Sequence, residues 1–200
     1  MKSALIVIDV QESFTRRPYF SAADVPAYLA AQNRLIEGFE AQGLPIVRVF
    51  HVSPGGDAGD AFALASGLVK PLEGLRPFTA AHEVHKTRHS ALVGTGLDVW
   101  LTQQGIGQIV ISGIRTEQCC ETTTRHASDL GWQVVFVPEA TLTHGQRAAG
   151  AFCPRDGRGR HSGPCPRRLS RRSEAPVKLR SAGGSTQTDA GQLRRAFALA

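Results

Sequence analysis

Two adjacent cysteines, Cys119 and Cys120, stand in the segment GIRTEQCCETTTRHASDLG (113–131), directly after the apolar run 108–112. The segment is typical of a helix that begins near the cysteines. Successive helical residues point about 100° apart, so only one of the two thiols can face a given pocket. A thiol in the first turn has its thiolate stabilised by free backbone N–H groups, and a nearby lysine lowers its pKa further. The pair therefore predicts one nucleophile and one packing residue.

Asp9 and Lys86 are the candidate partners of this thiol. Asp9 ends the apolar run 4–9, and Lys86 ends a short strand candidate at 83–86. Because the carboxyl ends of parallel strands meet at one edge of a sheet, an acid, a base and a thiol are expected to converge there. The acid could take the thiol proton and later deliver it to a leaving amine.

The elements that must position these residues alternate along the chain. Strands are predicted at 4–9, 45–52, 83–86, 108–112 and 132–140, and helices at 24–43, 94–105 and 116–131. The first run is apolar at nearly every position, as in a strand that is buried on both faces. The order predicts an α/β fold with three α/β/α layers, a mostly parallel central sheet and a Rossmann-like topology.

Charge divides the chain into two parts. Residues 1–144 carry 11 Lys and Arg against 14 Asp and Glu, a net charge of −3, whereas residues 145–200 carry 12 against 3, a net charge of +9. The second part is rich in Arg, Gly, Pro and Ser and has little apolar periodicity. We expect one domain at 1–144, followed by an atypical C-terminal tail at 145–200 that is disordered or arises from a shifted reading frame.

Composition also bears on location. No stretch approaches the roughly 18 apolar residues of a membrane span, and four cysteines, two of them adjacent, do not form a secreted disulfide framework. We therefore expect a cytoplasmic protein with no membrane partner.

Three motifs resemble those of the isochorismatase-like cysteine hydrolases, a family that includes nicotinamidases and N-carbamoylsarcosine amidases. They are IVIDVQESF (6–14), Lys86 with the following TRHSALVGTGL (87–97), and GIRTEQCC (113–120), and the resemblance spans residues 4 to about 143. It implies that Asp9, Lys86 and Cys119 form the catalytic triad. Within the pattern G-x-x-T-x-x-C, Cys119 is the implied nucleophile and Cys120 replaces a packing valine.

The resemblance implies further features of the site. A non-proline cis peptide is implied between Ile114 and Arg115, where the N–H groups of Arg115 and Cys119 would form an oxyanion hole. Gln11 and Phe14 could line the substrate pocket, or could equally be an ordinary turn residue and a core residue.

The implied function is hydrolysis of a C–N bond, an amide or carbamoyl group of a small molecule, through a cysteine thioester. The implied mechanism needs no cofactor. No metal is expected, because His51 lacks the Asp two positions earlier that a nicotinamidase-type metal site contains. Relatives usually assemble, so a homo-oligomer is expected.

Several alternatives stay open. Within the family, a vinyl ether hydrolase of the isochorismate type is a second chemistry. A catalytically dead relative whose basic tail binds nucleic acid non-specifically is another, although nucleic acid is not the expected partner because the tail lacks interleaved aromatic residues. Other patterns are a C-x5-R phosphatase signature ending at Arg125, a Cys–His pair, and a zinc site. Their candidate residues are His85, His126 and His144 for the pair, and Cys153, His161 and Cys165 for zinc.

Overall fold

The computed structural model describes residues 1–143 of the chain. Their core is a five-stranded sheet in the order β3-β2-β1-β4-β5, with every neighbouring pair parallel. The predicted parallel sheet is confirmed. The strands are β1 (Lys2–Ile8), β2 (Ile46–His51), β3 (His82–Lys86), β4 (Ile106–Ile114) and β5 (Gln133–Leu142).

The central strand β1 is buried on both faces, as its continuous apolar run predicted. Alternate side chains of a strand point to opposite faces of a sheet. Leu5 and Val7 accordingly belong to one apolar cluster, and Ile6 and Ile8 belong to another. The sheet therefore needs a covering layer on each face.

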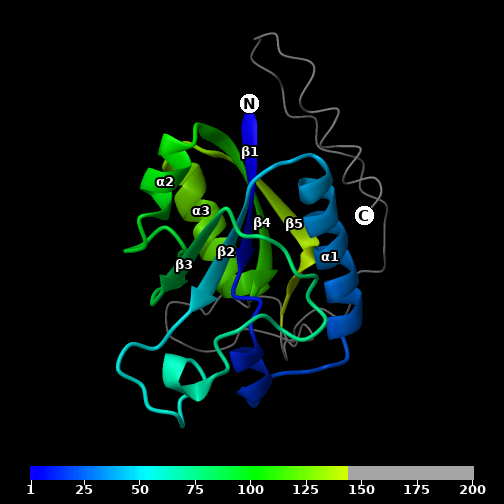
Figure 1. Cartoon of the computed structure of the whole chain (residues 1–200), viewed down its shortest axis with the longest axis vertical. Helices are drawn as coiled ribbons and strands as arrows, with labels where there is room; N and C mark the ends of the chain where they lie inside the picture. Colours follow the sequence, from blue (N-terminus) through cyan, green and yellow to red (C-terminus); the bar gives the residue numbers. More distant parts are fainter. Residues whose placement is uncertain (144–200) are drawn as a thin grey trace, which may run out of the picture. The chain divides into compact units, whose positions relative to one another are not determined.

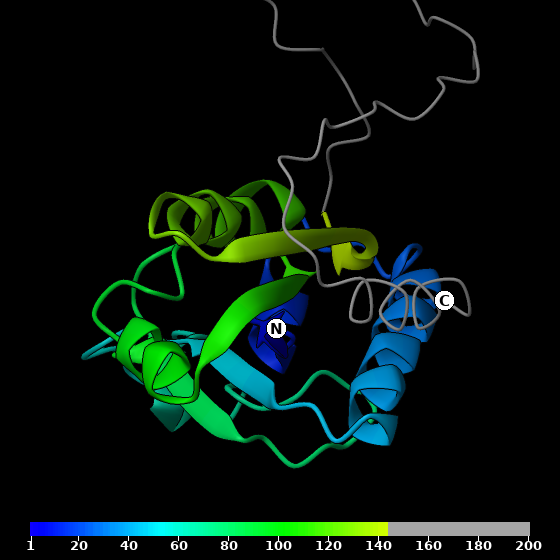
Figure 2. The same ribbon diagram turned by 90° about the horizontal axis from the view of Figure 1, so that it is seen from above.

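Helices supply both layers. Helix α1 (Val25–Ala41) covers the face that carries Leu5 and Val7, whereas α2 (Leu97–Gln103) and α3 (Glu121–Asp129) cover the other face. Figures 1 and 2 show α1 on one side of the sheet and the α2 and α3 pair on the opposite side. The three-layer α/β/α fold is thus confirmed. Three short helices, η1 (Glu12–Arg16), η2 (Leu64–Ser66) and η3 (Thr116–Cys120), complete the described part.

The predicted helices differ from the observed ones mainly at their ends. The predicted helix 116–131 begins as a π-helix, η3, and becomes the α-helix α3 only at Glu121. Helix α2 begins at Leu97 rather than near Thr95, because Gly96 has a φ of 69° that no helical residue adopts. Thr95 still accepts a hydrogen bond from the Leu97 N–H at 3.3 Å.

The expectations for the tail at 145–200 lie outside the described residues. No helix between residues 1 and 143 is long and apolar enough to cross a membrane.

Candidate active site

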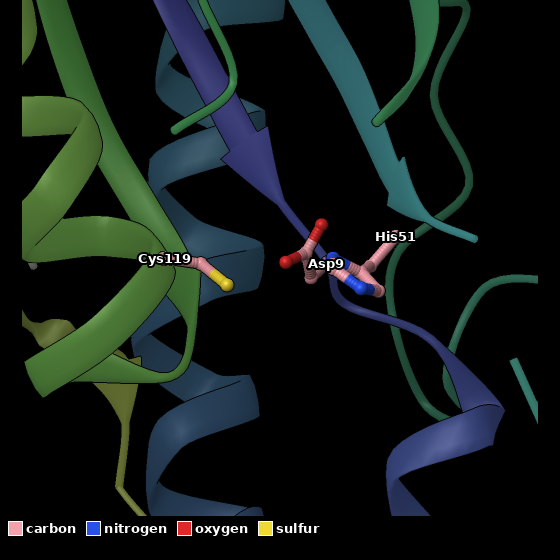
Figure 3. A group of neighbouring side chains, drawn as sticks. All are labelled: Asp9, His51 and Cys119. Atoms are coloured by element: carbon pink, nitrogen blue, oxygen red, sulfur yellow. The ribbon is translucent and has the colours of Figure 1, made fainter. Parts of the chain in front are cut away.

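Asp9, Lys86 and Cys119 meet in one buried cluster at the carboxyl edge of the sheet. The Lys86 Nζ lies 2.7 Å from the Asp9 Oδ2 and donates a hydrogen bond to the Cys119 Sγ at 3.3 Å. The three residues are 0%, 1% and 4% exposed. Asp9 follows β1, Lys86 ends β3 and Cys119 lies in η3, so three separate elements bring the predicted residues into contact. In Figure 3 the Cys119 sulfur points toward Asp9.

The cluster contains a fourth residue that sequence reasoning did not place there. His51 ends β2, and its Nδ1 lies 3.0 Å from the Lys86 Nζ. Figure 3 shows its ring beside Asp9. The sequence showed His51 only as an isolated histidine; the available signal was its place at the end of a predicted strand, the same signal that identified Asp9 and Lys86.

Asp9, His51 and Cys119 have the atom types of a metal site, and their polar atoms lie within 4.8 Å of one another. The Lys86 ammonium, however, is within hydrogen-bonding distance of all three. It also donates to the Arg88 carbonyl oxygen at 3.1 Å. A metal ion at this position would meet the lysine charge directly, so the donor set fits an ammonium rather than a cation from solution.

The electrostatics of the cluster correct one prediction. A thiol at a helix start beside a lysine was expected to have a lowered pKa. Instead, burial and the nearby Asp9 charge raise the pKa of Cys119 to about 12, because together they outweigh the attraction of Lys86. The resting sulfur is therefore a protonated thiol at neutral pH.

Burial also acts on the other two groups. It raises the pKa of Asp9, with the Lys86 charge opposing the shift. Burial alone would lower the pKa of Lys86, but the charges of Asp9 and Cys119 raise it, and the side chain stays an ammonium. Asp9 is thereby a stronger base than an exposed carboxylate, and Lys86 is a permanent charge beside it.

His51 is neutral at neutral pH. Burial, followed by the charge of Lys86, lowers its pKa to about 4. A neutral ring whose Nδ1 faces an ammonium donor accepts the hydrogen bond there, which assigns the ring proton to Nε2. His51 thus holds the Lys86 ammonium through a hydrogen bond without adding charge.

The two adjacent cysteines occupy different surroundings. Both belong to the apolar cluster on the α2 and α3 side, but the Cys119 Sγ also contacts Lys86, whereas Cys120 is wholly buried. Burial raises the pKa of Cys120 well above its ordinary value. The Cys119 thiol therefore contacts the Asp9 and Lys86 cluster; that Cys119 faces a substrate pocket stays a prediction.

Arg115 links β4 to η3. The Ile114–Arg115 peptide bond is cis. The Arg115 guanidinium stacks on the Tyr19 ring at 4.5 Å and forms an ion pair with Glu117. The oxyanion-hole role of the Arg115 and Cys119 N–H groups stays a prediction.

Gln11 and Phe14 lie near the cluster but are buried. The Gln11 side chain accepts from the His51 N–H at 2.8 Å and donates to the His51 carbonyl oxygen at 3.0 Å. Phe14 packs edge-on against Phe62, with ring centroids 5.0 Å apart. Gln11 therefore fixes the backbone of His51; contact of either residue with a substrate stays a prediction.

The competing patterns find little support in the described residues. Cys119 to Arg125 is helical rather than a phosphate-binding loop, and the exposed Arg125 pairs with Glu121. His85 is exposed on the other side of β3 from Lys86, and His126 contacts the Ser90 Oγ at 2.9 Å. The proposed base His144 and the zinc candidates Cys153, His161 and Cys165 lie outside the described residues.

One histidine that sequence reasoning overlooked does face the thiol. The Nδ1 of His89 lies 3.8 Å from the Cys119 Sγ. His89 is exposed to solvent in the loop that leaves β3, three residues after Lys86. That position at the carboxyl edge of the sheet could have identified it.

Comparison with known proteins defines the class. The family model described as the isochorismatase domain matches residues 3–152. The chain belongs to the isochorismatase family, and it is a hydrolase of that family.

Individual relatives agree with this assignment. The isochorismatase family protein YrdC of Bacillus subtilis is 28% identical over 73% of this chain and 76% of its own length. Streptothricin hydrolase of Streptomyces noursei is 28% identical in a match that covers 73% of this chain and 51% of that protein. Nicotinamidase 3 of Arabidopsis thaliana is 38% identical over 30% of each chain. The crystal structure of a candidate isochorismatase from Burkholderia xenovorans LB400 is 32% identical, with a TM-score of 0.63 over 70% of this chain and 66% of its own.

Proposed function

We propose that the protein is a cysteine hydrolase that cleaves a C–N bond, an amide or carbamoyl group, of a small molecule. The observation that carries the proposal is the Lys86 ammonium, which contacts both a carboxylate and a thiol inside a buried cluster. Relatives that are named for hydrolysing nicotinamide and streptothricin support it.

The first half of the reaction acylates Cys119. Because the pKa of the resting thiol is about 12, the proton leaves only as the sulfur attacks the carbonyl carbon. Asp9, whose pKa burial raises, takes this proton, and Lys86 keeps the carboxylate and the sulfur aligned. The N–H groups of Arg115 and Cys119 would hold the oxyanion. Asp9 then protonates the leaving amine, and a thioester remains.

The second half hydrolyses the thioester. Water attacks the acyl carbon, the C–S bond breaks, and the acid product leaves with the Cys119 thiol restored. No step requires a cofactor. A cytoplasmic location and assembly into a homo-oligomer stay predictions beside this proposal.

The decisive test replaces the nucleophile. Cys119→Ser should reduce ammonia release from a panel of small amides by about 10³-fold or more, since a buried serine has no comparably reactive form in this cluster. Cys120→Ala is the matched control, and it should retain turnover because its side chain only packs. Intact-mass spectrometry should find a covalent acyl adduct on Cys119.

Two results would contradict the proposal. One is full amidase activity in Cys119→Ser, and the other is an acyl adduct located on Cys120. Cleavage of a vinyl ether that survives in Cys119→Ser would instead favour the isochorismate-type chemistry, because a vinyl ether offers no acyl carbon to a thiol.

A further inference from the structure

The water-dependent half of the reaction needs a base, and within the triad the Asp9 carboxylate, free again once the amine has left, is one candidate. Asp9 is 0% exposed and its Oδ2 is engaged by Lys86. Yet the water that cleaves a thioester must come from solvent and must lose a proton as it attacks. A group at the solvent side of Cys119 is better placed to take that proton.

Among residues 1–143, two histidines lie near the triad, and the His89 ring is the one in contact with the sulfur. The Nδ1 of His51 contacts Lys86 at 3.0 Å and is thereby committed to it. The Nδ1 of His89 lies 3.8 Å from the Cys119 Sγ, while the residue is open to solvent. A water molecule that approaches an acyl group on this sulfur from outside would pass beside the His89 ring.

The backbone around His89 is held on both sides. Before it, the Arg88 carbonyl oxygen accepts from the Lys86 Nζ at 3.1 Å. After it, the Ala91 N–H donates to the Thr123 Oγ1 at 3.0 Å, and that hydroxyl donates to the Cys119 carbonyl oxygen at 2.6 Å. The backbone on both sides of His89 is therefore tied to Lys86 and, through Thr123 of α3, to the Cys119 carbonyl oxygen, which restrains where the imidazole can lie.

We propose that His89 is a further catalytic residue, the general base of thioester hydrolysis; the inference rests on the proposed cysteine mechanism. The water oxygen forms the new bond to the acyl carbon as one water proton passes to His89 Nδ1. The C–S bond then breaks with its electron pair going to Sγ, and the imidazolium returns that proton to the sulfur. The products are the carboxylic acid and the Cys119 thiol, with His89 unchanged.

The experiment separates the two half-reactions with p-nitrophenyl acetate as the acylating probe. His89→Gln keeps a polar side chain but cannot carry a proton. It should retain the initial burst of nitrophenolate, and its steady-state rate should fall by about 10²- to 10⁴-fold. Intact-mass spectrometry should then find acetyl-Cys119 accumulated. Hydroxylamine, which needs no general base, should clear this adduct at the same rate in the variant and in the wild type.

His85→Gln is the matched control. His85 is an exposed histidine on the face of β3 opposite Lys86. Its replacement should leave the burst of nitrophenolate and the steady-state rate unchanged. A His89→Gln protein that deacylates as fast as wild type overturns the inference, and so does one that loses the burst without accumulating adduct. If wild-type Cys119 is not acylated at all, the proposed function and the inference about His89 both fail. If the wild type turns over through acetyl-Cys119, a negative result for His89→Gln counts against the role of His89 alone.

Discussion

The most consequential single residue is Lys86, whose buried ammonium joins four acceptors. It contacts Asp9, His51, Cys119 and the Arg88 carbonyl oxygen. Burying an ammonium is costly unless charged and polar partners replace its water. Here each partner comes from a different strand end or loop, so the charge that the chemistry needs also ties those elements together.

His51 should make stability depend on pH. Its pKa is lowered to about 4 in the folded protein from the ordinary value of 6.5, so between these values the unfolded chain binds more protons. Stability contributed by the neutral ring is therefore full above about pH 6.5 and decreases as the pH falls toward 4. His51→Asn removes this titration. When the pH falls from about 7 to about 4.5, the free energy of unfolding should therefore decrease by about 1 kcal/mol more in the wild type than in this variant; solvent screening of the partly exposed ring keeps the difference this small.

Urea unfolding at about pH 7 and about pH 4.5 measures this difference. His85→Asn is the control, because His85 is exposed and away from the cluster. Equal losses in wild type and His51→Asn would show that the His51 ring does not carry the pH dependence.

At the scale of elements, Gly113 sets how closely β4 approaches β1. It pairs with Ile8 in the sheet and has a φ of 129°. A Cβ at this position would lie 2.0 Å from the Ile8 carbonyl oxygen, a backbone atom that cannot move aside. Only glycine therefore allows β4 to end where η3 can present Cys119 toward Asp9.

Gly113→Ala should destabilise the protein by more than about 4 kcal/mol or prevent folding. Gly131→Ala is the matched control: Gly131 has a φ of 97°, and a Cβ added there would meet nothing within 4 Å, so only backbone strain of about 1–2 kcal/mol is expected. Thermal and urea unfolding of both variants measure the difference. Similar stability losses would contradict the role assigned to the close approach.

The elements also show where prediction from sequence ends. Long apolar runs located the strands, since a strand buried on both faces leaves an unbroken pattern. The π-helical turn at Thr116–Cys120 was not predicted, because its five residues, TEQCC, contain no pattern that separates a π-helical turn from the first turn of an α-helix. The start of α2 was displaced because Gly96 adopts a left-handed conformation, with a φ of 69°, that ends the helical geometry before Leu97.

At the scale of the whole molecule, the charge is unevenly divided. Residues 145–200 carry a net charge of +9 and residues 1–144 a net charge of −3. Basic residues in such a segment bind phosphate without sequence preference and release counterions when they do.

The alternative of a nucleic-acid-binding tail predicts that the full chain binds a single-stranded oligonucleotide weakly at low salt and loses it near about 0.2 M salt. Replacing Arg167, Arg168, Arg171 and Arg172 with Gln should reduce this binding, whereas the same change at the exposed Arg16, Arg34, Arg76 and Arg125 should not. Fluorescence anisotropy across a salt series measures both. Binding that resists salt or depends on base sequence would contradict a purely electrostatic origin.

The sequence by itself determined the order of the elements, the parallel sheet and the edge at which Asp9, Lys86 and Cys119 gather, because residue type and spacing decide which runs become strands and where they end. Only the tertiary structure decided that His51 and His89 join them, that Lys86 contacts every member but His89, and that the pKa of Cys119 rises to about 12 rather than falls. Those outcomes depend on burial and on distances between side chains from separate segments, and both exist only once the chain has folded.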